Sequence, residues 1–300
     1  MQFENGATGT RTYTATGTLT FTDATAANYI ADIVGANGDV IFAANSRTVT
    51  MPGTLNLGNG ANVGALTFTT GAISGGALTV AIAAAYMSLG SGSHSFTGAW
   101  TNSTTTASWA AGTGTVTFNA GAAATMTFAG ANLAEDEFNN VTFNDSAAMT
   151  YTMATRGLRL GGTLSITDTV TTVALDTSAV SNLAVTAGAI TISTNGTLTA
   201  NGSTITISGN FNFNAGTFTF GTSTVVFAAD GTMTTPGVSN TVYLYNMTLN
   251  AGVDLTITGH SRYSNTITTN ATATISSPAY NFWVSGSLVS NGAALDVDLA

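Results

Sequence analysis

The chain has 300 residues, a formal net charge of −9 and no cysteine, and only 6% of its residues are charged although 44% are hydrophobic. Its five basic residues are all arginines, so we expect no binding to nucleic acid and no attraction to anionic membranes, which require clustered Lys and Arg. The absence of cysteine excludes disulfides, thiolate nucleophiles and cysteine metal sites. No apolar run approaches the roughly 20 residues of a membrane helix, so we expect no membrane insertion.

Residues 1–37 are predicted to be a strand-rich segment that serves as a cap or as a preceding repeat. A short turn of helix is also compatible with the pattern from Ala24 to Val34. Met1 to Gly6 has neither the positive nor the apolar region of a secretory signal. Residues 295–300 alternate like a strand and stop without a cap. The alternatives are a protein exported without such a signal and a fragment of a longer protein, and the uncapped C-terminal strand favours the fragment.

Residues 38–300 contain an imperfect internal repeat, which fixes architecture before any other signal is considered. Gly112 to Asn119 reads GTGTVTFN, and Gly221 to Ala228 reads GTSTVVFA, an offset of 225 − 116 = 109 residues. The flanking segments return at similar offsets, and a partial copy surrounds Val40 to Asn45. The copies lie near residues 40–57, 98–167 and 209–258.

Apolar residues alternate with small polar residues through most of the chain, as in Leu66-Thr67-Phe68-Thr69 and Ile205-Thr206-Ile207-Ser208. This period of two is typical of half-buried strands. Asn-Gly pairs between them, including Asn195-Gly196 and Asn201-Gly202, suit turns that need positive φ. The chain is therefore predicted to be all-β. Tandem β-sandwiches are the alternative to a β-solenoid, but no ~100-residue block carries their tryptophan-centred core.

The repeated motif also predicts which side chains form the core. Val116, Phe118, Val225 and Phe227 should point inward, and their threonine neighbours should face outward, because a slip of one residue would invert every side chain. These threonines are Thr115, Thr117 and Thr224. Val226 breaks the alternation.

The motifs carry a resemblance to a group of proteins. The order Gly-x-Trp/Phe, Gly-Thr-x-Thr-Val-x-Phe, Asn-x-Thr-Phe/Leu-Asn and Gly-Thr-Leu-x-Ile, the last at Gly162 to Ile166, resembles repeats of large bacterial and archaeal surface proteins and of phage virion proteins. Those proteins are similar to autotransporter passengers and filamentous haemagglutinin-like adhesins. The resemblance implies a right-handed parallel β-helix that serves as an extracellular stalk or adhesin, and it transfers no catalytic residue.

Few residues are candidates for chemistry. His94 lies in a polar, turn-like stretch, and His260 has Asp254 and Arg262 nearby in the sequence; we interpret both histidines as turn residues rather than as catalytic groups. Glu135-Asp136-Glu137 is interpreted as a solvated loop, and calcium binding there stays open because the acids lack the spacing of a calcium loop. Asp168 and Asp176 could approach each other on neighbouring turns to cleave a polysaccharide, with Arg156 and Arg159 contacting an acidic sugar, but this is one arrangement among many that fourteen scattered acids permit.

Aromatic residues are candidates for stacking on sugars. They are Trp100, Trp109, Trp283, Tyr243, Tyr245, Tyr263 and Tyr280. Trp100 and Phe211 occupy equivalent repeat positions and are predicted to be core residues. Tyr243 and Tyr245 share one strand face by period two, so they are the predicted glycan contact.

The sequence thus predicts a non-enzymatic structural or adhesive segment of a large surface or virion protein. We expect no catalytic residue, cofactor or metal site, and partners that are copies of the chain or host-surface glycans. The expected location is extracellular, at the cell surface or in a virion. The alternative function is a carbohydrate-active β-helix, such as a tailspike-like depolymerase or lyase.

Overall fold

A computed structural model describes residues 9–21, 28–30, 38–58, 63–80, 85–102, 110–128, 137–178, 180–237, 241, 243–277, 280–292 and 296–299. The chain divides into two compact units. Unit 1 comprises Met1–Asp145 and Met153–Gly161, and unit 2 comprises Ser146–Thr152 and Gly162–Ala300. All regular structure in the described ranges is strand, and none of them contains a helix long and apolar enough to cross a membrane.

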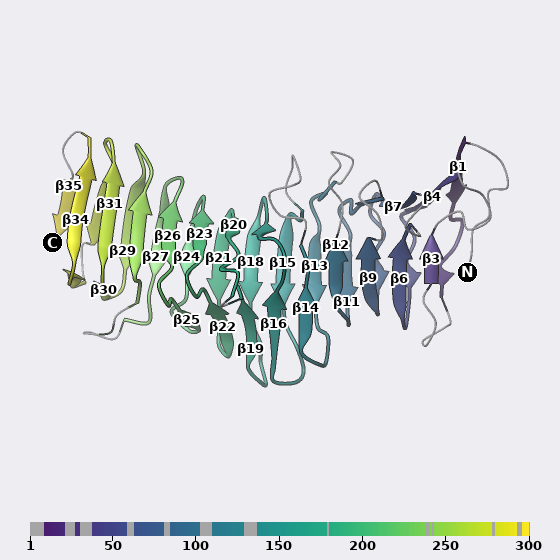
Figure 1. The fold of residues 1–300 in the computed structure, drawn as a ribbon, viewed down its shortest axis with the longest axis horizontal. Coiled ribbons are helices and arrows are strands. Elements are labelled where there is room, and N and C mark those ends of the chain that lie inside the picture. Colours follow the sequence, from purple (N-terminus) through teal and green to yellow (C-terminus); the bar gives the residue numbers. More distant parts are fainter. Residues whose placement is uncertain are drawn as a thin grey trace. The chain divides into compact units, whose positions relative to one another are not determined.

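Unit 1 is built from three parallel sheets, and consecutive strands of the chain belong to different sheets (Figure 1). The first sheet contains β1 (Gly9–Thr14), β4 (Gly38–Asn45), β7 (Gly64–Phe68) and β10 (Tyr86–Ser88). The second contains β2 (Leu19–Thr20), β5 (Val49–Thr50), β8 (Ile73–Ser74), β11 (Ser93–Phe96), β13 (Thr115–Phe118) and β15 (Asn140–Phe143). The third contains β3 (Asn28–Ile30), β6 (Thr54–Leu57), β9 (Ala77–Val80) and β12 (Trp100–Asn102). The remaining strands of this unit are β14 (Ala124–Met126) and β17 (Leu158–Arg159).

Unit 2 repeats this arrangement, with a small extra sheet. Its first sheet contains β18 (Thr163–Ile166), β21 (Ala189–Ile192), β24 (Phe211–Asn212), β27 (Gly231–Thr234), β29 (Asp254–Thr258), β32 (Thr274–Ser277) and β35 (Asp296–Leu299). The second contains β16 (Met149–Met153), β19 (Val173–Asp176), β22 (Gly196–Thr199) and β25 (Thr217–Thr219). The third contains β20 (Val185–Ala187), β23 (Thr204–Ile207), β26 (Thr224–Phe227), β28 (Asn246–Leu249), β31 (Thr266–Asn270) and β34 (Ser287–Asn291). The extra sheet pairs β30 (Ser261–Tyr263) with β33 (Phe282–Val284).

One turn of the coil is the structural repeat. In the third sheet of unit 2, Ile205 pairs with Val225, and Val225 pairs with Met247, so successive turns are 225 − 205 = 20 and 247 − 225 = 22 residues long. The strand pairs described within each unit are parallel, which a tandem array of antiparallel sandwiches would not show. The predicted parallel β-solenoid is therefore confirmed, with about 10 turns, and the sandwich alternative is excluded. The handedness of the coil stays a prediction.

The predicted inside and outside of the repeated motif are confirmed. Val116 and Phe118 of β13 are buried, and so are Val225 and Phe227 of β26. Their threonine neighbours Thr115, Thr117 and Thr224 are half-exposed, as is Val226. Inward apolar positions stack turn on turn, because parallel pairing in register places like positions directly above one another. The helical alternative near Ala24 is wrong for Asn28–Ile30, which form β3.

The turn residues explain why glycine begins both copies of the motif. Gly112 and Gly221 have φ of 66° and 56°, a region that disfavours residues with a Cβ. A Cβ on Gly112 would also lie 1.8 Å from the carbonyl oxygen of Gly90, one turn below. Asn195 and Asn201 take positive φ as predicted for the Asn-Gly pairs, at 62° and 51°.

Asparagine side chains connect successive turns of unit 2. Asn246 Oδ1 accepts hydrogen bonds from Asn265 Nδ2 at 2.8 Å and from the backbone nitrogen of Thr266 at 3.2 Å. Asn246 Nδ2 donates to Thr224 Oγ1 at 3.4 Å. One side chain thus bonds the turn below and the turn above, which is how a neutral polar surface stabilises the stack.

Replacing Asn246 by alanine is expected to lower the free energy of unfolding by about 1–2 kcal/mol, because it leaves the Thr266 N–H and the Asn265 amide without their acceptor. Asn246→Asp keeps both acceptor interactions and should lose less. Asn250→Ala, an exposed residue just after the same strand, is the matched control. Urea denaturation measures all three, and equal losses for Asn246→Ala and Asn250→Ala would contradict a role for the ladder.

Candidate functional site

The extra sheet of unit 2 carries a group of half-exposed aromatic and basic side chains. The group begins with His260, which lies between β29 and β30. The residue before it, Gly259, has a φ of 134°. A Cβ on Gly259 would lie 2.4 Å from Thr235 Oγ1, so glycine lets the chain turn close to that threonine. Thr235 Oγ1 donates a hydrogen bond to the carbonyl oxygen of His260 at 2.7 Å, which holds the corner in place.

Strand alternation then sorts the side chains of β30. Ser261 and Tyr263 are buried, and Arg262 between them is half-exposed. Arg262 pairs in register with Trp283 of β33, which is also half-exposed. Neighbouring parallel strands lie roughly 4.8 Å apart, so the arginine and the tryptophan are adjacent on the same flank of the coil.

Three rings gather around His260. The His260 ring lies 5.5 Å from the Tyr280 ring at 86°, and 6.2 Å from the Trp283 ring at 33°, measured between centroids. Tyr280 is 42% exposed. We name the group His260, Arg262, Tyr280 and Trp283 the flank cluster.

The hydrogen bonds of the flank cluster use only some of its donor groups. His260 Nδ1 accepts from the backbone nitrogen of Asn281 at 3.2 Å, which places the proton of the neutral ring on Nε2. Arg262 donates through Nε to Ser285 Oγ at 3.2 Å. Arg262 forms no ion pair with an acid in the described ranges, so its terminal nitrogens keep their donor capacity. This is an uncompensated cation on a chain of net charge −9.

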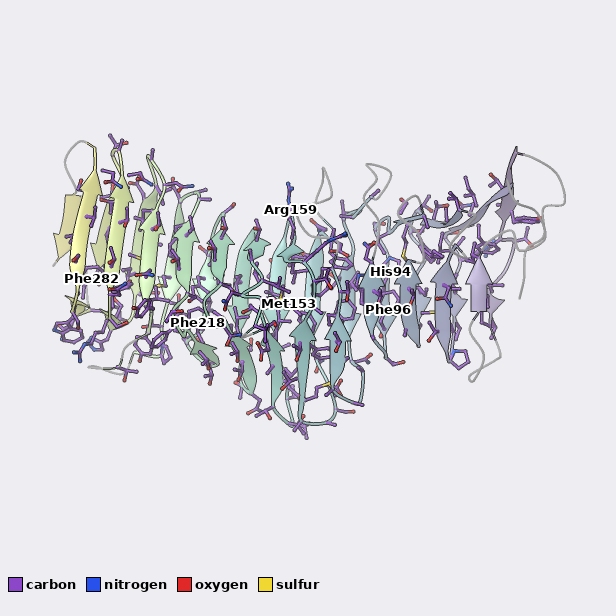
Figure 2. All side chains as sticks on the ribbon, in the orientation of Figure 1. His94, Phe96, Met153, Arg159, Phe218 and Phe282 are labelled. Carbon is purple, nitrogen blue, oxygen red and sulfur yellow. The ribbon has the colours of Figure 1, made fainter. Side chains whose placement is uncertain are left out.

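The underside of the cluster is a packed core. Phe282, the first residue of β33 and labelled in Figure 2, has its ring centroid 5.1 Å from that of Tyr263. Tyr263 is fully buried, and this burial raises the pKa of its hydroxyl above the ordinary value of 10. The tyrosine therefore acts as an apolar support and not as a proton donor or acceptor in neutral solution.

The structure separates the two tyrosines that the sequence grouped. Tyr243 is only 7% exposed and packs against Phe213, with the ring centroids 5.8 Å apart, whereas Tyr245 is half-exposed. Both precede β28 rather than lying within a strand, so period two does not place them on one strand face. Glycan contact at Tyr243 and Tyr245 stays a prediction, but Tyr243 offers little surface for it.

His94 is not the turn residue that the sequence suggested. It lies in β11 and is 1% exposed, facing the core of unit 1 beside Phe68, whose ring centroid is 5.0 Å away (Figure 2). Its Nδ1 accepts from the backbone nitrogen of Ile73 at 3.2 Å, and its Nε2 donates to the Leu89 carbonyl at 2.8 Å. Burial lowers the pKa of the imidazole. The polar neighbours of His94 concealed a strand with an inward histidine.

Glu137 also corrects the sequence interpretation. It is fully buried rather than part of a solvated loop. Its Oε1 accepts hydrogen bonds from Trp100 Nε1 at 3.0 Å and from Asn102 Nδ2 at 2.9 Å. The carboxylate is therefore engaged within unit 1, and Trp100 is a core residue as predicted. Glu135, Asp136 and Trp109 lie outside the described residues.

The two candidate catalytic carboxylates are held in separate local turns. Asp168 accepts from the backbone nitrogen of Val170 at 2.8 Å and from Thr171 Oγ1 at 2.7 Å, and these hydrogen bonds hold its pKa below the ordinary value. Asp176 accepts from the backbone nitrogen of Ser178 at 2.8 Å and from Asn201 Nδ2 at 2.7 Å. Arg156 and Arg159 belong to unit 1, whereas both aspartates belong to unit 2. In the described ranges, no three His, Asp or Glu side chains are grouped as metal ligands.

Comparison with known proteins identifies no family for this fold and flank cluster. No protein-family model matches the sequence, and no curated protein or solved structure is significantly similar to it.

The sequence alone could have revealed the flank cluster only if the number of residues in one turn of the coil had been known. Arg262 and Trp283 are 283 − 262 = 21 residues apart, which is one turn of unit 2. His260 and Arg262 are close in the sequence, and so are Tyr280 and Trp283, but only the register brings the two pairs together.

Proposed function

We propose that this chain is a non-enzymatic structural or adhesive segment of a large extracellular surface or virion protein. Its work is mechanical: each turn buries its apolar row against the next, and backbone and side-chain ladders run along each unit. Its location at a cell surface or in a virion, and self-association or host glycans as partners, belong to the same proposal.

The observation that supports it best is the stacking of neutral polar residues outside a continuous apolar interior. In unit 2, outward Thr206 lies above Thr186, and Thr248 lies below Thr268. Such rows bind water and bond to one another without the repulsion that stacked like charges would produce. The low content of Lys and Arg also leaves only five residues at which trypsin-like proteases could cleave.

The alternative, a glycan depolymerase or lyase, requires two carboxylates that converge on one bond. Asp168 instead accepts hydrogen bonds within its own turn, and Asp176 accepts them from Ser178 and from Asn201 of the next turn of the coil. This arrangement favours the structural proposal over the enzyme.

A cleavage assay tests the proposal. The protein is incubated with neutral and acidic polysaccharides, and new reducing ends are measured; we expect none above background. If cleavage occurs and disappears in Asp168→Asn or Asp176→Asn, with Asp230→Asn as a matched control, the chain is an enzyme and the proposal is wrong. Loss of one catalytic acid or base typically costs 10²–10⁴-fold, so the outcome is easily read.

A further inference from the structure

We propose that the flank cluster binds a sugar residue that carries a carboxylate, such as a hexuronic acid within a glycan. The inference deepens the proposed function, because it supplies the adhesive segment with a ligand class and a site. It rests on four side chains of unit 2: His260, Arg262, Tyr280 and Trp283.

The rings select the sugar. Trp283 and Tyr280 flank the His260 ring and keep part of their surface in solvent. Half-exposed aromatic rings present a flat apolar surface and cost little conformational entropy to order, which suits the C–H face of a pyranose.

The arginine selects the charge. Arg262 lies next to Trp283 in the ladder and uses only Nε for its hydrogen bond to Ser285. A guanidinium with free terminal nitrogens matches a carboxylate through two parallel hydrogen bonds. His260 Nε2 adds a neutral donor for a hydroxyl or ring oxygen.

The charge of the whole chain limits the ligand further. With a net charge of −9, the chain as a whole repels an extended polyanion. A single carboxylate on an otherwise neutral glycan gains the contact with Arg262 without that repulsion. The site therefore favours an isolated acidic sugar over nucleic acid or a densely charged polymer.

The test uses a disaccharide of glucuronic acid linked to a neutral hexose, and its methyl ester, which keeps both rings but lacks the charge. Ligand titrations followed by NMR should give saturable binding of the acid, and at least tenfold weaker binding of the ester. Arg262→Gln and Trp283→Ala should each weaken binding of the acid at least tenfold. Higher salt should weaken binding of the acid more than that of the ester.

Arg47→Gln is the matched control, because Arg47 is an exposed arginine of unit 1 and its loss changes the net charge equally. It should change the affinity less than twofold. The inference is overturned if acid and ester bind equally, if Arg47→Gln weakens binding as much as Arg262→Gln, or if the acid does not bind. Circular dichroism and thermal unfolding of each variant confirm that a loss of binding is not a loss of fold; should Trp283→Ala unfold, Trp283→Phe replaces it.

The same samples separate the two proposals. Binding of the disaccharide together with its cleavage would uphold the site and contradict the non-enzymatic function. Absence of both binding and cleavage would remove the site and leave the structural function standing.

Discussion

Phe118→Ala is expected to lower the free energy of unfolding by about 3–5 kcal/mol, since Phe118 is fully buried and truncation leaves a cavity in a close-packed interior. Its ring contacts those of Phe96, Phe128, Phe138, Phe143 and Trp100, with centroids 5.3–6.5 Å apart. Two of these contacts, to Phe96 and Phe143, are stacked and come from the turns before and after. The substitution therefore weakens three successive turns at once.

Urea denaturation measures this loss. Phe118→Leu keeps most of the apolar volume and should cost clearly less than the alanine variant. Thr117→Ala, at the adjacent outward position of β13, should change stability by less than about 1 kcal/mol. A similar loss for Thr117→Ala and Phe118→Ala would contradict the inside and outside assigned to the strand.

The sequence predicted the fold because a strand reveals its two faces locally. Val116 and Phe118 alternate with threonines, and this period of two holds whichever strand lies beside β13. Parallel coiling was inferred from the imperfect internal repeat and from the resemblance to repeats of large surface proteins. What local pattern cannot supply is the length of each turn, since loops of different size join the strands. The register, and with it every contact between turns, follows from that length.

The sequence interpretation was wrong for His94 and Glu137 because their burial depends on strand phase and on contacts between turns, which the local sequence does not show. His94 stands among serines and glycines, yet the strand phase of β11 turns it inward, where two backbone groups satisfy its ring. Glu137 lies beside two acids in the sequence, but its partners Trp100 and Asn102 are 35–37 residues away. A buried polar residue depends on distant partners, so its own neighbours in the sequence say little about it.

The buried His94 predicts a loss of stability in mild acid. Its folded pKa lies below the unfolded value of 6.5, because burial disfavours the imidazolium. Protonation would also turn Nδ1 into a donor facing the Ile73 N–H, which already donates to it. The stabilising contribution of the neutral ring is therefore complete above pH 6.5. It is lost as the pH falls from 6.5 toward the folded pKa, by up to about 1.4 kcal/mol per pH unit.

Stability measured by urea denaturation between pH 7.5 and pH 5 tests this, in a range above the titration of ordinary carboxylates. His94→Gln should flatten the pH dependence, although its stability at pH 7.5 also falls because the glutamine fits the site less well. His260→Gln is the matched control: it removes the other histidine, which is half-exposed, and should keep the slope of the parent protein. If His94→Gln and the parent lose stability in parallel below pH 6.5, the acid sensitivity does not come from His94. A curve that His260→Gln flattens and His94→Gln does not would equally contradict the assignment to His94.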